Sequence, residues 1–93
     1  MIEYVVPTLG ALADKHRLQV VDLLTQNPTM TRQQIAKTLQ ISPTELFYDL
    51  QVLLKSNIIR VTERPGHTKH YAIDSITLAR VLSVLKSCFR LEV

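Results

Sequence analysis

Apolar residues recur at helical spacing in the first third of the chain. Between positions 14 and 26 the apolar face consists of Leu18, Val20, Val21 and Leu24. Asp14 precedes this face and is a favourable N-cap, because its carboxylate can accept a hydrogen bond from a main-chain N–H of the first turn. The pattern predicts a helix that ends before Asn27. A second apolar pattern, in residues 3–13, predicts another helix with Pro7 in its first turn.

Two further helices begin with a capping signal. Thr31 and Gln34 have the spacing of a capping box, in which each side chain accepts from the main-chain N–H of the other residue. Met30 and Ile35 occupy the hydrophobic-staple positions on either side of that box. The pattern predicts a short helix that begins after Thr31.

The same signal returns eleven residues later. Ser42 is the expected N-cap, Glu45 closes the box, and Pro43 occupies the first helical position, where its missing N–H is not needed. This helix is expected to end near Asn57, since Asn tolerates the left-handed conformation that often follows a helix. Two helices joined by a short turn are typical of a helix-turn-helix, which we place at about residues 31–56.

Beyond this motif the pattern changes from helical to alternating. Two runs each put apolar side chains on one face: Ile59 and Val61 in the first, Tyr71 and Ile73 in the second. Pro65 and Gly66 form a turn signal between the runs. The stretch predicts a β-hairpin at about residues 58–73.

A last helix begins at Asp74 or Ser75 and is apolar around more than one stripe. The chain is therefore expected to be mainly α with a small β-hairpin, in the order α-α-α-α-β-β-α of a winged helix-turn-helix, as a single domain over residues 1–93. The terminal helices, about residues 3–13 and 75–90, have more apolar surface than one small core can bury. We expect them to form the interface of a homodimer.

Composition and charge narrow the function. The 93 residues carry a net charge of +3 with a pI near 9.3, which permits nucleic-acid binding without requiring it. The single cysteine, Cys88, excludes an internal disulfide and favours a reducing compartment, so a cytoplasmic protein is expected. No run approaches the ~20 apolar residues of a membrane span. No catalytic triad, carboxylate pair or glycine-rich phosphate loop has a recognisable spacing, so no enzyme is expected.

At about 100° per residue, the second helix of the motif separates into two faces. Its buried face is expected to hold Leu46, Leu50 and Leu53, and the opposite face comprises Thr44, Tyr48, Gln51 and Lys55. Glu45 and Asp49 fall together on one flank. Glu45 is expected to complete the capping box, with a contact to a cytosine amino group as the alternative. Asp49 is expected to pair with a basic side chain, and Phe47 to cover the edge of the core or touch a thymine methyl group.

Several stretches resemble the ArsR family of small winged-helix repressors. LGALADKHRLQVVDLL is similar to the first core helix of that family, IAKTLQIS and DLQVLLKSNIIR resemble its helix-turn-helix, and GHTKHYAI falls where its wing normally falls. The resemblance covers roughly residues 8–90. It implies a homodimeric repressor that binds a near-palindromic operator in double-stranded DNA, with one recognition helix for each half-site.

The chain departs from this family at several positions. Gln40 stands where the family usually has glycine, so a left-handed turn would have to hold a side chain there. The cysteine pairs and the Asp and His ligands of the family's metal sensors are missing, and His67 with His70 is a weak ligand set, so no metal or other cofactor is expected. Cys88 is more typical of a small buried apolar residue than of a thiol sensor. The sequence points to no particular inducer.

The residues expected to contact DNA are Arg32, Thr44, Glu45, Tyr48, Gln51, Lys55, Arg64, His67 and Lys69. Those on the second helix of the motif would read base edges, whereas Arg32 and the basic wing residues would contact phosphates. The alternative is a winged helix that binds another protein through the acidic and aromatic flank of Glu45, Phe47 and Asp49.

Overall fold

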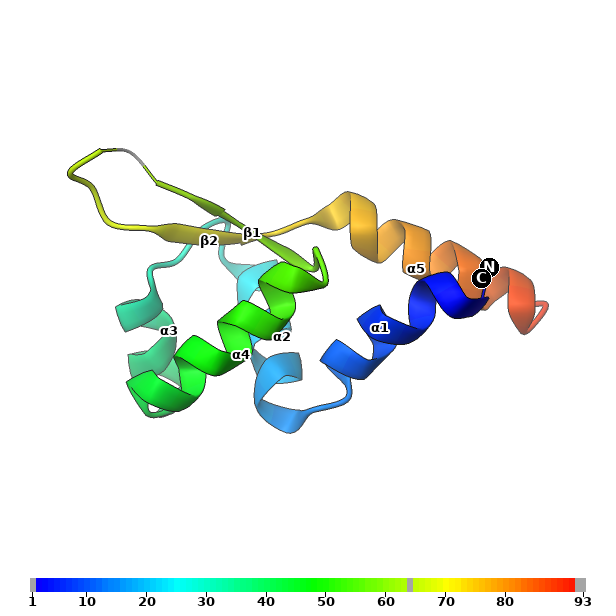
Figure 1. The fold of residues 1–93 in the computed structure, drawn as a ribbon, viewed down its shortest axis with the longest axis horizontal. Coiled ribbons are helices and arrows are strands. Elements are labelled where there is room, and N and C mark those ends of the chain that lie inside the picture. The colour runs from blue at the N-terminus through cyan, green and yellow to red at the C-terminus, as the bar shows by residue number, and fades with distance from the viewer. Residues whose placement is uncertain (1, 64, 92–93) are drawn as a thin grey trace.

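The structure is a computed structural model that describes residues 2–63 and 65–91. Its elements are α1 (Ile2–Leu12), α2 (Lys15–Gln26), α3 (Arg32–Leu39), α4 (Pro43–Lys55), β1 (Ile59–Thr62), β2 (His70–Ile73) and α5 (Ser75–Cys88). The expected class, mainly α with one hairpin in winged helix-turn-helix order, is confirmed (Figure 1). In the described part of the chain, no helix is long and apolar enough to cross a membrane.

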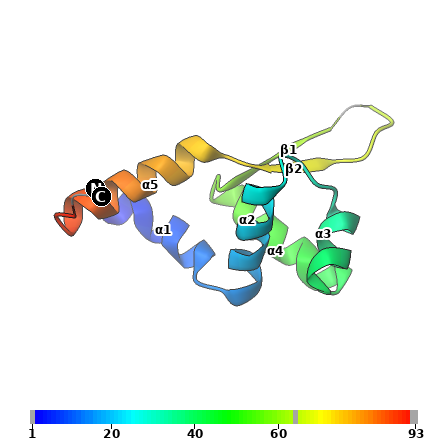
Figure 2. The ribbon, with the colours of Figure 1, turned by 180° about the vertical axis from the view of Figure 1, so that it is seen from behind.

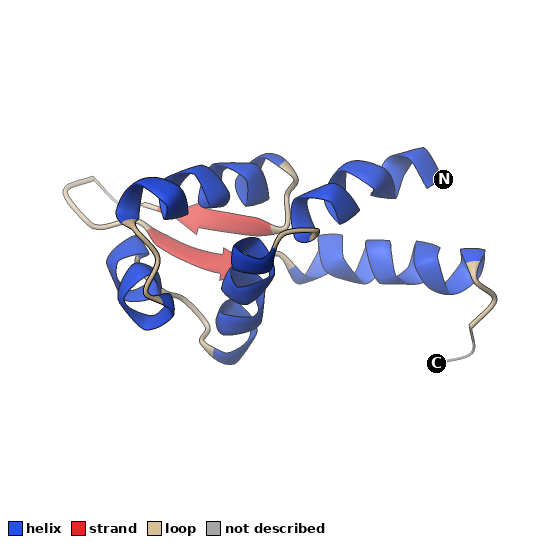
Figure 3. Ribbon diagram, turned by 90° about the horizontal axis from the view of Figure 1, so that it is seen from below, coloured by secondary structure: helices blue, strands red, loops and turns tan. Residues whose placement is uncertain are grey.

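The molecule is elongated, with a longest dimension of 45 Å. The helix-turn-helix α3–α4 and the hairpin lie at one end, and α1 and α5 lie at the other (Figure 1). Seen from behind, α2 stands between α1 and α3 and packs against both of them (Figure 2). Viewed from below, α1 and α5 run side by side away from the hairpin (Figure 3).

The main core lies where α2, α3, α4 and the hairpin meet. Its fully buried side chains are Val20, Ile35, Leu46, Leu50, Leu53 and Ile58. The predicted buried face of α4 is therefore confirmed. The predicted apolar face of α2 is wrong at Leu18, which is 53% exposed. The helix directs Val20 and Val21 into the core and leaves Leu18 on its outer side.

Local capping signals fix most helix starts. Asp14 accepts from the Arg17 N–H, and Asp74 accepts from two N–H groups at the start of α5. The capping box of Thr31 and Gln34 is complete, with both reciprocal hydrogen bonds formed. The prediction that Pro7 lies in the first turn of its helix is wrong. Helix α1 begins at Ile2, so the proline lies inside the helix, beyond the first turn.

The two helix ends of the motif use left-handed residues. Gln40 has a φ of 55° at the end of α3, in the position where the resemblance implied a glycine. After α4, Asn57 has a φ of 60°, as predicted, and the N–H groups of Asn57 and Ile58 donate to the carbonyls of Leu54 and Leu53. This hydrogen-bond pattern is a Schellman motif, which ends α4 and turns the chain into β1.

The hairpin is joined to the helix-turn-helix by main-chain hydrogen bonds. β1 and β2 pair antiparallel, with Val61 opposite Tyr71. The Met30 N–H donates to the Tyr71 carbonyl at 3.0 Å, and the Tyr71 N–H donates to the Met30 carbonyl at 2.8 Å. Met30 directly precedes the N-cap of α3, so the base of the wing and the start of α3 form one unit.

A small second core joins the terminal helices. It contains Val5, Val81 and Val84, with Leu9 and Leu85 packed against them. Leu12 and Leu78 pack against the main core, whereas seven large apolar side chains of this end are at least half exposed: Ile2, Tyr4, Val6, Ile76, Leu82, Phe89 and Leu91. Cys88 is exposed as well, which corrects its expected burial, because the last turn of α5 extends beyond the second core.

Candidate nucleic-acid interface

The exposed face of α4 carries a polar stripe that we call the reading face, made of Thr44, Tyr48, Gln51 and Lys55. All four side chains are exposed, and Tyr48 is 63% exposed. The three leucines that anchor α4 are fully buried on the other side of the helix. The reading face therefore offers hydroxyl, amide and phenol groups to a partner, and its only charge is the ammonium of Lys55.

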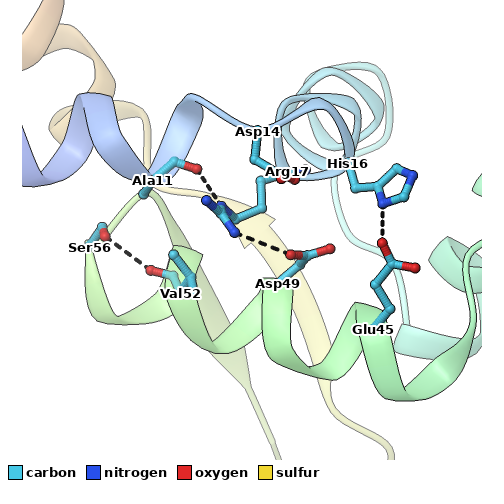
Figure 4. Close-up of polar contacts among 8 residues, drawn as sticks. All are labelled: Ala11, Asp14, His16, Arg17, Glu45, Asp49, Val52 and Ser56. Atoms are coloured by element: carbon cyan, nitrogen blue, oxygen red, sulfur yellow. Dashed lines mark hydrogen bonds and ion pairs between the residues drawn. The ribbon is translucent and has the colours of Figure 1, made fainter.

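Asp49 does not lie on the reading face. It is almost fully buried, and one of its carboxylate oxygens lies 3.4 Å from Nη1 of Arg17 on α2 (Figure 4). The Arg17 Nε donates to the Ala11 carbonyl at 2.6 Å, which holds the guanidinium between α1 and α4. The expected pairing of Asp49 with a basic residue is confirmed.

Two opposed influences act on the ionisation of Asp49. Burial raises the pKa of this carboxyl group above its ordinary value, and the negative charge of Asp14 adds to the rise. The nearby Arg17 guanidinium lowers the pKa but does not cancel the effect of burial. Asp49 is thus an acid that the fold has withdrawn from solvent and from any ligand on the outer surface of α4.

Glu45 turns toward α2 as well. Its carboxylate contacts Nδ1 of His16 (Figure 4). Ser42 caps α4 as predicted by accepting from the Glu45 N–H at 3.2 Å, but the capping box expected here is only half formed. The reason is tertiary: an imidazole from α2 lies within reach and takes the carboxylate that would otherwise bond to the Ser42 N–H.

Arg32 and Phe47 form a contact between the two helices of the motif. The guanidinium carbon of Arg32 lies 5.8 Å from the centroid of the Phe47 ring. Phe47 was expected at the edge of the core, but it is half exposed and Arg32 covers its face. A cation–π contact at an exposed site contributes roughly 0.5–1 kcal/mol, which is enough to orient Arg32 but leaves it accessible to a phosphate.

The wing carries the remaining predicted contacts. Lys69 lies 3.6 Å from Glu63, and both side chains are more than half exposed, so this ion pair is weak and easily exchanged. His67 is exposed, and the neighbouring His70 donates from Nδ1 to the Thr68 carbonyl at 3.0 Å. Arg64, predicted to contact phosphate, lies outside the described residues.

The structure thus brings together one set of predicted residues and separates others. Thr44, Tyr48, Gln51 and Lys55 share one face of α4, whereas His67 and Lys69 belong to the wing. Glu45 does not lie on the reading face, because its carboxylate is directed toward His16. His16 and Arg17 were not among the predicted site residues. They lie 29 and 32 positions before their partners, and no local pattern connects residues so far apart.

Comparisons with known proteins agree with this geometry. Residues 12–62, more than half of the chain, match the model of a family described as "Helix-turn-helix domain". No curated protein sequence matches the chain significantly.

Three solved structures illustrate the shared fold. The homodimeric winged helix-turn-helix DNA-binding domain of a possible ArsR-family transcriptional regulator from Mycobacterium bovis is 25% identical, with a TM-score of 0.75 over 96% of this chain and 81% of that one. NolR from Sinorhizobium fredii is 23% identical, with a TM-score of 0.75 over 95% and 86% of the two chains. An ArsR-like transcriptional regulator from Rhodococcus sp. RHA1 is 16% identical, with a TM-score of 0.86 over 96% and 82%.

The Mycobacterium bovis domain is that of a possible ArsR-family transcriptional regulator and the Rhodococcus protein is an ArsR-like one; neither is described as an enzyme, in agreement with the sequence prediction. The matched family model, the α3–α4 motif and the hairpin tied to it lead to one conclusion. The chain belongs to the helix-turn-helix domain family, in the winged form that it shares with ArsR-like transcriptional regulators.

Proposed function

We propose that the protein is a homodimeric, sequence-specific DNA-binding regulator of transcription that acts as a repressor. The observation that carries this proposal is the reading face of α4. It is an exposed polar stripe on a helix whose opposite side is fully buried in the core. Hydroxyl and amide groups such as those of Thr44 and Gln51 match the donors and acceptors on base edges in the major groove.

The position of the acidic residues supports DNA over a protein partner. An acidic flank on α4 would have suited a basic protein surface, but Asp49 is buried beside Arg17 and Glu45 contacts His16. The outer surface of α4 is therefore less acidic than its sequence indicates. Attraction to phosphate would come from Arg32 on α3 and from His67, Lys69 and Arg64 in the wing segment, and such contacts position a protein without selecting a sequence.

The apolar surface of the terminal helices supports a dimer. Tyr4 and Val6 on α1 and Ile76 and Leu82 on α5 are more than half exposed, although the two helices already share a small core. A second copy would cover this surface. In a two-fold dimer, two α4 helices would meet successive major-groove turns of a near-palindromic operator, with half-sites about one helical turn apart.

The test is selection of bound duplexes from a random DNA pool by the purified protein at low and at near-physiological salt, followed by sequencing. Enrichment of a near-palindrome is the expected result, and placing that site across a promoter should reduce transcription in a purified system. A folded dimer that enriches no sequence at either salt would overturn the proposal and favour a protein partner.

A further inference from the structure

Three side chains with metal-binding atoms meet between α2 and the first half of α4. They are His16 of α2 with Glu45 and Asp49 of α4, which lie one helical turn apart on the same flank. One nitrogen or oxygen atom of each lies within 4.8 Å of the others. Figure 4 shows the imidazole and both carboxylates turned toward one another. An imidazole with two carboxylates is a ligand set used by divalent transition metals.

A buried oxygen atom points into this cluster. The side chain of Asp49 is only 6% exposed, and its Oδ1 faces Arg17. No group among the described residues forms a hydrogen bond with its Oδ2, and that second oxygen points toward the side of His16 and Glu45 (Figure 4). A buried carboxylate oxygen without a partner is costly, and a bound cation would satisfy it.

The charge around the cluster suits a divalent ion. Asp14, Glu45 and Asp49 bring three carboxylates to this region, against the single guanidinium of Arg17. These carboxylates outnumber the guanidinium by two. A divalent cation balances this excess, and the partly exposed side chains of His16 and Glu45 leave the cluster open to solvent.

We propose that His16, Glu45 and Asp49 bind a divalent transition metal of the Zn²⁺ type. Binding replaces the contact between His16 and Glu45 with two bonds to the same ion. The imidazole nitrogen favours Zn²⁺, Co²⁺ or Ni²⁺ over Mg²⁺ and Ca²⁺, which prefer all-oxygen sites with more ligands. Three protein ligands leave at least one coordination position for water.

The site has a consequence for regulation, which rests on the proposed DNA-binding function. The ion joins α2 to the N-terminal half of the reading helix and adds positive charge near the surface that would face phosphates. Metal occupancy should therefore tighten DNA binding and steepen its dependence on salt.

The experiment uses the untagged, metal-free protein. Zn²⁺ binding is measured by titration calorimetry, and Co²⁺ serves as a spectroscopic probe of an ordered nitrogen and oxygen site. One equivalent per chain is expected. His16→Gln and Glu45→Gln, both at partly exposed positions, should each weaken Zn²⁺ binding roughly tenfold or more. Asp49→Asn should do the same if circular dichroism shows that it folds.

Two control variants remove similar groups elsewhere. Asp22→Asn takes an acid from the exposed face of α2, and His70→Gln takes an imidazole from the wing. Both should bind Zn²⁺ as the unchanged protein does. Absence of stoichiometric binding, or equal binding by the unchanged protein and the His16 and Glu45 variants, would overturn the site and leave only an ion-pair network.

The DNA measurement separates the two proposals. Stoichiometric metal binding with no DNA binding under any condition would overturn the proposed function and leave the site standing. Metal binding that does not change DNA affinity would overturn the regulatory coupling alone.

Discussion

The guanidinium of Arg17 lies 3.4 Å from a carboxylate oxygen of Asp49, and through this contact α2 retains an acidic residue of α4 inside the protein. Removing the cation would leave a buried carboxylate without its partner. We expect Arg17→Met to lower the free energy of unfolding by about 3 kcal/mol, as is typical when one member of a buried pair is removed. Urea unfolding at a fixed protein concentration measures this change.

Arg32→Met is the matched control for that prediction, since Arg32 is an exposed arginine on α3 with only a cation–π contact. Its cost should stay below about 1 kcal/mol. Equal losses in the two variants would show that Arg17 does not stabilise Asp49.

The reading face predicts a loss of sequence preference. Tyr48→Ala combined with Gln51→Ala should abolish the preference for the selected operator over random duplex, with the fold and the dimer unchanged, because each side chain points away from the core. Each good base contact contributes about 1–3 kcal/mol of discrimination. Competition binding measures this preference, with Gln19→Ala on α2 as control. Retained preference would mean that another surface reads the bases.

Removal of a basic side chain from the wing is expected to lower the affinity for all DNA sequences equally. Lys69→Ala should weaken binding to every duplex and make the slope of log affinity against log salt shallower by about one unit. The sequence predicts the same for Arg64→Ala. Lys86→Ala, an exposed lysine on α5, should leave the slope unchanged. A change in sequence preference would contradict a role limited to phosphate contact.

The terminal helices predict the site of dimerisation. Leu82 on α5 is 65% exposed, and Leu82→Asp should convert the dimer to a monomer because it places a charge in an apolar interface. Light scattering after size exclusion measures the mass. Leu18→Asp, at a similarly exposed leucine on α2, is the control and should remain dimeric. A dimeric Leu82→Asp variant together with a monomeric Leu18→Asp variant would show that the interface lies on α2.

The turn of the motif predicts a gain of stability. Gln40 has a φ of 55°, which is unfavourable for a residue with a side chain. Gln40→Gly should raise the free energy of unfolding by about 0.5–1 kcal/mol, the relief of strain being partly offset by a more flexible unfolded chain. Asn57→Gly should gain less, since Asn tolerates this conformation. Thermal unfolding of both variants provides the comparison, and a loss of stability in Gln40→Gly would contradict the argument.

The features predicted from the sequence depend on short-range chemistry. A capping residue such as Asp14 and the bond it accepts lie within one turn, so the helix start can be recognised from neighbouring letters alone. The left-handed conformation of Asn57 follows from its residue type at a helix end, and the burial of Leu50 follows from the helical period. Element order and the buried face of α4 were therefore accessible from the sequence.

The sequence predictions that were wrong depend on contacts between different helices. Periodicity places Leu18 among apolar residues but cannot tell whether another helix covers it, and it is exposed. Glu45 has a local partner available in Ser42, yet its carboxylate contacts His16 from another helix. The acidic flank of α4 was therefore considered as a surface for a protein partner, because its partners on α2 could not be recognised from the sequence.

The paired backbone of Met30 and Tyr71 has a mechanical consequence. Because these residues exchange two main-chain hydrogen bonds just before α3 begins, the hairpin cannot hinge freely against the recognition unit. The base of the wing and the α3–α4 motif are therefore held at a fixed spacing. In the proposed complex, a duplex would contact both parts together and would dissociate from both together.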